Sequence, residues 1–234
     1  MKRIIFNHKS YLTYDEINNY KKEISKLIPE NYELIIFPQI IYLTMFKNVK
    51  YKIGAQNFYS YNSGSFTGEA NIKSLKSINV NYLLLGHSER KELVNETYSL
   101  IRNKLFKSLN AKVDTTLCIG ELKREKSAIK YIKKELNYYM HNLESDNIDY
   151  LTIAYEPAWA IGGFESLPTD EIKKTVEVIK KYFQKKYNKE IKVLYGGSVT
   201  KDDINEILEV TDGVLIGKDS SDITKVKELI KVLN

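Results

Sequence analysis

Side chains that could move a proton follow two apolar, strand-like runs of this 234-residue sequence. Glu156 comes directly after the run Leu151–Tyr155, and burying a carboxylate at such a position is costly unless the group is paired or used. His87 follows the run Tyr82–Leu85, where a histidine can serve as a proton donor or simply pack and cap a helix. General acid–base chemistry is therefore the first function to consider.

Groups that could hold an anion follow other apolar runs. Lys9 closes the motif Asn7-His8-Lys9, although a lysine after a strand is more often a surface residue. The motif Gly196-Gly197-Ser198 is either a tight turn or a phosphate cradle, in which glycines bring backbone N–H groups and a helix N-terminus to the anion. Gly217-Lys218 follows the last run.

The other histidines and the single cysteine receive no chemical role. We predict that His8 and His141 are surface residues and that Cys118 is a packed small hydrophobe. Three histidines and one cysteine show no metal-ligand spacing, so we expect no metal site. One cysteine excludes an internal disulfide framework and is typical of a reducing cytoplasm.

Eight strand-like runs alternate with amphipathic helical patterns along the chain. The runs are nearly all apolar, as expected when both faces of a parallel sheet are covered. They span residues 3–7, 33–37, 52–56, 82–85, 115–119, 151–155, 192–195 and 213–216. Helices are predicted over residues 14–28, 125–143 and 170–187 and at the C-terminus.

This alternation predicts one domain, residues 1–234, with the (β/α)8 barrel fold. An open, doubly wound sheet shows the same alternation, but it gathers its polar residues at one crevice. Here polar motifs follow strand after strand, and the C-terminal ends of barrel strands form a ring around one site. The distribution favours the barrel.

Composition and charge narrow the possible partners. The chain is 43% hydrophobic and 28% charged, as in an ordinary globular protein. No apolar run approaches the roughly 18 residues needed to cross a bilayer, and the first residues do not read as a secretory signal. The net charge of +6 is spread over helices that mix lysines with acids, so we expect neither nucleic-acid nor membrane binding.

The motifs resemble those of the triosephosphate isomerase family over the whole chain. Eight blocks occur in that family's order and close to its spacing, and such a series is far more specific than one glycine motif. The blocks begin at Asn7, Gly54, Gly64, Gly86, Cys118, Ala154, Tyr195 and Asp212, and the longest reads AYEPAWAIG.

The resemblance implies a TIM barrel and an aldose–ketose isomerase without a cofactor. It implies that Glu156 removes the proton beside the substrate carbonyl and that neutral His87 polarises the substrate oxygens. It also implies that Lys9 stabilises the developing negative charge, with Asn7 as its polar companion and Glu89 as its neighbour.

The implied phosphate site departs from the family pattern at one end. Gly162, Ser198 and Gly217 match positions whose backbone amides hold the phosphate. Lys218 and Asp219 replace small residues of the family. A lysine there can assist an anion, whereas an aspartate would repel one.

The implied lid, residues 157–168, is shorter and bulkier than usual over residues 163–167, where Tyr195 and Ser198 would latch it. Three functions therefore stay open. The first is interconversion of dihydroxyacetone phosphate and D-glyceraldehyde 3-phosphate through an enediolate. The second is isomerisation of a longer phosphorylated ketose such as a tetrulose phosphate, and the third is a catalytically weak barrel that only binds.

The segment Asn62–Glu69 resembles the family loop that reaches into a neighbouring subunit. It would place Thr67 near the partner's Lys9. The resemblance therefore implies a homodimer.

Overall fold

Eight parallel strands close into a barrel in this computed structural model, which describes residues 1–162 and 166–234. Each strand pairs with the next along the chain, and β8 pairs with β1. The strands are β1 (Lys2–Asn7), β2 (Tyr32–Phe37), β3 (Lys52–Ala55), β4 (Tyr82–Leu85), β5 (Asp114–Ile119), β6 (Leu151–Tyr155), β7 (Lys192–Tyr195) and β8 (Gly213–Ile216). The closed ring confirms the (β/α)8 barrel, and the open-sheet alternative is wrong.

The strand boundaries agree with the predicted runs to within one residue, because both faces of the sheet are buried. Alternate strand residues form a separate cluster that fills the barrel interior. Its members are Ile5, Ile35, Phe37, Leu84, Cys118, Ala154, Leu194 and Leu215. The intervening residues pack outward against the helices in a second, larger cluster.

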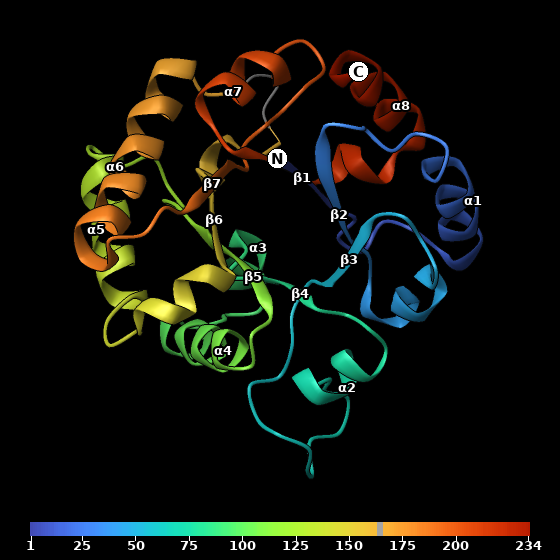
Figure 1. Ribbon diagram of the computed structural model, residues 1–234, viewed down its shortest axis with the longest axis horizontal. Helices are drawn as coiled ribbons and strands as arrows, with labels where there is room; N and C mark the ends of the chain where they lie inside the picture. Colours follow the sequence, from blue (N-terminus) through green and yellow to red (C-terminus); the bar gives the residue numbers. More distant parts are fainter. Residues whose placement is uncertain (163–165) are drawn as a thin grey trace.

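A ring of helices surrounds the strands (Figure 1). The α-helices are α1 (Tyr14–Ile24), α2 (Ile72–Ser77), α3 (Ser88–Leu93), α4 (Tyr98–Asn110), α5 (Ala128–Tyr139), α6 (Thr169–Tyr187), α7 (Ile204–Val210) and α8 (Ile223–Leu233). Short 3-10 helices are η1 (Ile40–Phe46), η2 (Ser145–Tyr150), η3 (Ala158–Ala160) and η4 (Lys218–Ser221). No helix of the described residues could span a membrane.

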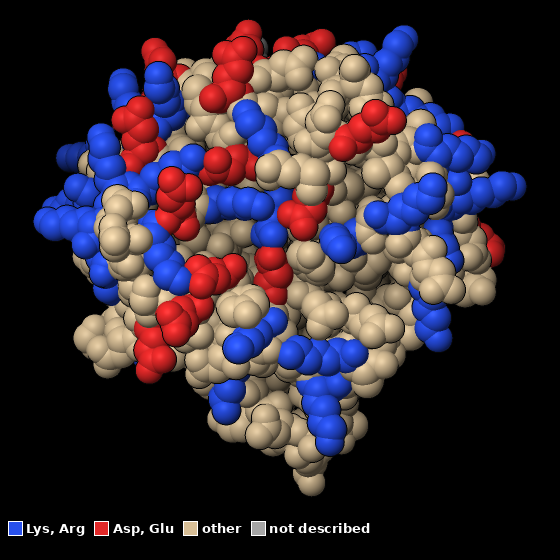
Figure 2. Space-filling view, in the orientation of Figure 1, with Lys and Arg blue, Asp and Glu red and all other residues tan. Residues whose placement is uncertain are grey.

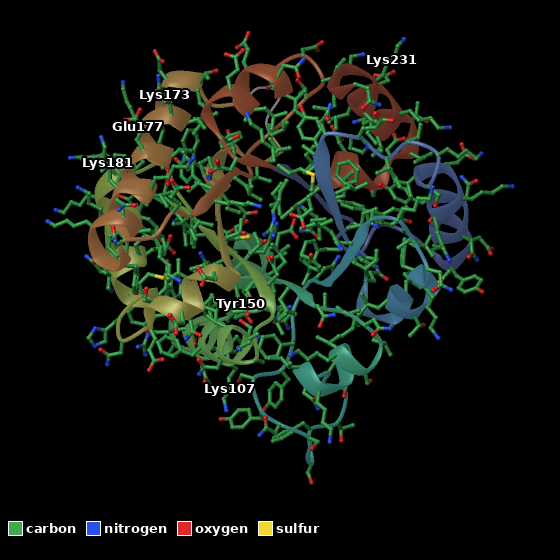
Figure 3. All side chains as sticks on the ribbon, viewed as in Figure 1. Lys107, Tyr150, Lys173, Glu177, Lys181 and Lys231 are labelled. Carbon is green, nitrogen blue, oxygen red and sulfur yellow. The ribbon has the colours of Figure 1, made fainter. Side chains whose placement is uncertain are left out.

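Helix α6 shows why these segments are helical. Its predicted apolar stripe, which includes Ile172 and Phe183, is fully buried. Figure 3 shows Lys173, Glu177 and Lys181 pointing away from the barrel on its opposite side. Because one face is apolar and the opposite face is charged, the helix packs on the sheet in one orientation about its own axis.

Two helices are shorter than predicted. Helix α1 ends at Ile24 rather than near Ile28, because Lys26 and Leu27 donate to carbonyls three residues back and tighten the chain. Helix α5 covers residues 128–139 rather than 125–143. Its start is set by Ser127, whose hydroxyl accepts the N–H of Lys130 at 3.3 Å.

The chain between β3 and α2 projects from the barrel (Figure 1). Tyr59, Tyr61 and Phe66 hold this segment together, with ring centroids 4.8 to 5.4 Å apart. Figure 2 shows acidic and basic side chains mixed over the visible face, while the tip of the projection is uncharged. This segment includes the predicted subunit loop.

Candidate active site

Glu156 and His87 face each other at the ends of β6 and β4. Oε1 of Glu156 lies 3.5 Å from Nε2 of His87, and both side chains are buried. Among the described residues neither carboxylate oxygen has a hydrogen-bond partner. A side chain at Gly196 would collide with Glu156, since a Cβ there would lie 2.8 Å from its Cγ. The carboxylate is therefore placed to accept a proton from a bound molecule.

The backbone determines which nitrogen of His87 carries the proton. His87 is the N-cap of α3, and its Nδ1 accepts the N–H of Glu89 at 3.3 Å. In the neutral ring, an Nδ1 that accepts leaves the proton on Nε2. Nε2 is the nitrogen that lies 3.5 Å from Oε1 of Glu156, so a substrate oxygen bound next to the base can accept its N–H.

Lys9 joins the same group through Glu89. Its Nζ lies 2.5 Å from Oε1 of Glu89, and its backbone N–H donates to Oδ1 of Asn7 at 3.1 Å. Lys9 has a φ of 50°, in the left-handed region that a non-glycine residue rarely adopts. The structure thus brings together Asn7, Lys9, His87, Glu89 and Glu156.

Gln56 secures the strained turn that carries Lys9, a role that the sequence did not reveal. Its side-chain amide donates to the carbonyl of Lys9 and to that of Phe37, both at 2.9 Å, and to Oδ1 of Asn7 at 3.3 Å. The sequence shows an amide side chain just after a strand. It does not show which atoms this side chain binds, because two of them are backbone carbonyls, which every residue has.

Two of the residues predicted to hold phosphate contact Lys9 and the lid. Gly217 lies against Lys9, since a Cβ there would be 3.0 Å from Cε of the lysine. Ser198 donates from Oγ to the carbonyl of Ala160 at 2.9 Å, which brings it to the lid near Gly162. Gly162 has a φ of 79°, which favours glycine.

Lys218 and Asp219 are less closely joined to the site. Lys218 begins η4, and its side chain is exposed. Asp219 pairs with Lys225 at 2.7 Å. This partner offsets part of its negative charge, which weakens the repulsion that the sequence predicted.

Both ends of the lid are attached to the barrel. The hydroxyl of Tyr195 accepts the N–H of Leu167 at 3.0 Å, while Trp159 donates from Nε1 to Glu121 at 3.1 Å. Together with the bond from Ser198, the contact of Tyr195 forms the latch that the sequence implied. Residues 163–165 of the altered lid segment lie outside the described residues.

Two of the three minor predictions hold, and one is wrong. His8 is not a surface residue: α1 covers it, and its ring packs edge-on against Tyr20 at 4.4 Å. Burial lowers the pKa of His8 to about 3. His141 is exposed, as predicted. Cys118 is buried, and burial, followed by the charge of Glu156, raises the pKa of its thiol well above the usual range.

The arrangement supports proton transfer at a carbon next to a carbonyl group. It combines a buried carboxylate, an imidazole and an ammonium group, with Gly217 beside the ammonium. In the part of the chain that the structure describes, no cluster of three or more His, Cys, Asp or Glu is placed to hold a metal ion.

Comparisons with known proteins agree with this geometry. The family model described as triosephosphate isomerase matches residues 2–233. A triosephosphate isomerase of Helicobacter pylori (strain Shi470) is 35% identical over 234 residues, with 97% of each chain covered. The enzyme of Mycoplasma genitalium is 35% identical, and the match covers 86% of each chain. That of Dictyoglomus thermophilum is 33% identical, and the match covers 92% of this chain and 93% of the relative. The chain belongs to the triosephosphate isomerase family.

Proposed function

We propose that this protein interconverts dihydroxyacetone phosphate and D-glyceraldehyde 3-phosphate through an enediolate. The observation that carries the proposal is the 3.5 Å approach of His87 Nε2 to a Glu156 carboxylate that has no other partner among the described residues. The relatives named above are all triosephosphate isomerases. They favour neither a longer ketose as substrate nor a barrel that only binds.

Each side chain has one task in the proposed reaction. Glu156 removes a proton from the carbon beside the carbonyl, the electron pair of that C–H bond forms a carbon–carbon double bond, and the π pair of the carbonyl moves to its oxygen. The N–H of His87 and the ammonium of Lys9 stabilise the negative charge as it develops. The hydroxyl proton of the enediolate then moves to the other oxygen by way of the His87 imidazole, and Glu156 returns its proton to the neighbouring carbon, so that aldose and ketose exchange without any net gain or loss of atoms.

The phosphate is held away from the reacting carbons in this proposal. Backbone amides of Gly162, Ser198 and Gly217 bind its oxygens, and Lys218 adds positive charge at the rim. The latched lid keeps water from the enediolate and discourages loss of the phosphate group. Substrate length is then limited by the space between the phosphate and Glu156.

A coupled isomerase assay with triose and tetrose phosphates side by side tests the proposal. We expect fast turnover of the triose phosphates and slow or no turnover of the four-carbon compounds. Fast turnover of a tetrulose phosphate and slow turnover of the trioses would instead support the longer-substrate alternative. Binding of triose phosphates without turnover would support the catalytically weak barrel.

We further propose a homodimer formed through Asn62–Glu69. Three large apolar side chains stand exposed at or near this segment, with 54% of Tyr61, 36% of Phe66 and 68% of Ile41 accessible. A groove beside the projection is lined by Ile40, Ile41 and Gln56, among others. Since Gln56 also binds the Lys9 turn, a partner's loop in this groove would lie next to the site.

Light scattering after size-exclusion chromatography tests the dimer. We expect the intact protein to have twice the mass of one chain, and Ile41→Asp and Phe66→Asp to give monomers. Val232→Asp, at an exposed apolar position on α8, serves as the matched control and should stay dimeric. A monomeric intact protein would contradict this part of the proposal.

We also propose a cytoplasmic location. The single cysteine, Cys118, is a buried free thiol, and proteins that rely on no disulfide are typical of reducing compartments. Cell fractionation with an antibody to the native protein tests the location, and recovery outside the cytoplasmic fraction would contradict it.

A further inference from the structure

A buried ion pair lies behind the proposed catalytic base. Nζ of Lys91, on α3, lies 3.2 Å from Oε1 of Glu135, on α5, and the two side chains are 5% and 3% exposed. Replacing such a pair by apolar residues is often neutral or stabilising, because both charges lose their hydration on burial. A contribution to stability therefore does not by itself explain why the chain has this ion pair.

Both charged groups bind the end of β5. Oε2 of Glu135 accepts the backbone N–H of Gly120 at 2.7 Å, and Lys91 reaches the carbonyl of Cys118 at 3.5 Å. These two backbone groups flank Ile119, whose carbonyl accepts the N–H of Glu156 at 2.8 Å. The ion pair thus holds both neighbours of the residue whose carbonyl binds the backbone N–H of the base.

Gly120 also touches Glu156 directly. Its φ is 152°, and a Cβ at this position would lie 2.0 Å from the carbonyl oxygen of Glu156. The two backbones are therefore in close contact with no side chain between them. A shift of Gly120 is transmitted to Glu156, because packed backbone cannot absorb it.

The same pair is connected to the imidazole. Lys91 lies on α3, the helix whose N-cap is His87. At the preceding residue, Gly86, a Cβ would be 3.0 Å from the carbonyl of Cys118, so the ends of β4 and β5 are also in contact. The pair joins the helix that carries His87 to the strand end that supports Glu156.

We propose that Glu135, paired with Lys91, is a positioning residue for the isomerase reaction. Through its bond to Gly120, Glu135 sets the position of Glu156 relative to His87. This inference rests on the proposed function. Glu135 touches neither the base nor the imidazole, so its effect is on the geometry of the reacting groups. Burial raises the pKa of Glu135, and the charge of Lys91 opposes this effect, which makes the lysine a necessary partner for an ionised acceptor.

Two double variants isolate the bond to Gly120. Lys91→Met with Glu135→Gln has no buried charge but keeps an oxygen that can accept the Gly120 N–H, whereas Lys91→Met with Glu135→Leu keeps none. We expect the first to retain kcat within about 3-fold of the intact protein and the second to lose at least about 10-fold. KM should change less than about 2-fold in both, since the phosphate site is untouched.

A matched control lies at the other end of the barrel. Glu33 pairs with Arg3 at 2.6 Å, near the N-terminal ends of β2 and β1. Glu33→Leu should lower the thermal unfolding temperature without changing kcat. The acid limb of the pH profile of kcat/KM, which reports the free enzyme's base, should shift in the Met/Leu variant and not in Glu33→Leu.

A further variant covers the case in which the protein with Lys91→Met and Glu135→Leu (the Met/Leu protein) fails to fold. Glu135→Asp keeps the charge but withdraws the acceptor by one methylene, and it should lower kcat about 10-fold at unchanged KM. Equal kcat in the Met/Gln and Met/Leu proteins, or intact kcat in Glu135→Asp, overturns the positioning role. An intact protein that does not isomerise triose phosphates overturns the proposed function, and this inference with it.

Discussion

His87 and Glu156 come within 3.5 Å of each other although β5 lies between the strands that carry them. Glu156 directly follows β6 and His87 lies two residues after the end of β4, so both lie at the C-terminal end of the barrel. Their separation is set by the parallel pairing of β4, β5 and β6. Small changes in the reach of either side chain should therefore affect the chemistry strongly.

Glu156→Asp tests that sensitivity. The shorter side chain withdraws the carboxylate by about one methylene, and misplacement on this scale can cost roughly 100-fold in rate. We expect kcat to fall by at least about 100-fold while KM changes only a few-fold, measured by steady-state kinetics. Glu206→Asp, an exposed change on α7, is the control. An unchanged kcat in Glu156→Asp would remove Glu156 from the base role.

Lys9→Met removes the ammonium and keeps most of the side-chain volume. Loss of one group that stabilises a developing oxyanion typically costs about 100- to 1,000-fold, and we expect kcat/KM to fall by that order. Glu89→Gln removes the partner but leaves the ammonium near Gly217, so its loss should be much smaller. Equal losses in the two variants would indicate that the ion pair, rather than the ammonium, matters.

Tyr195→Phe removes the hydroxyl that accepts the N–H of Leu167. A net hydrogen bond contributes about 1 kcal/mol, so we expect the closed lid to be destabilised and kcat to fall roughly 5- to 10-fold. Tyr182→Phe, which loses a hydroxyl bonded to the carbonyl of Leu136 outside the site, is the matched control. A Tyr195→Phe protein with intact kcat would show that this latch does not limit turnover.

His8 makes the fold sensitive to acid. Its pKa is about 3 in the folded protein and 6.5 when unfolded, so the unfolded chain binds more protons below about pH 6.5. The contribution of neutral His8 to the free energy of unfolding is fully present above that pH. It decreases as the pH falls toward 3, and the loss between pH 7 and pH 5 is about 2 kcal/mol.

Urea unfolding of the intact protein and of His8→Phe across this range measures the effect of His8. The variant should lose less stability on acidification, since phenylalanine binds no proton. His141→Gln, at an exposed position, should follow the intact protein. Parallel pH profiles for the intact protein and His8→Phe would contradict the assignment.

The strands and the principal site residues could be predicted because their signals are local. A strand buried on both faces is a short apolar run, and Glu156 and His87 each follow one. His8 could not be placed, since its burial depends on where α1 packs. Glu135 lies among lysines on an amphipathic helix and resembles a solvated residue, and only its contact with Gly120 distinguishes it.

The left-handed conformation of Lys9 also has a consequence for protein engineering. A non-glycine residue held at such a φ costs about 1–3 kcal/mol, and glycine at position 9 would remove that cost. A screen for thermostable variants would therefore favour Lys9→Gly, which lacks the ammonium group that the proposed reaction needs. At this position heat resistance and turnover are opposed, and a stabilised enzyme must gain its margin elsewhere in the chain.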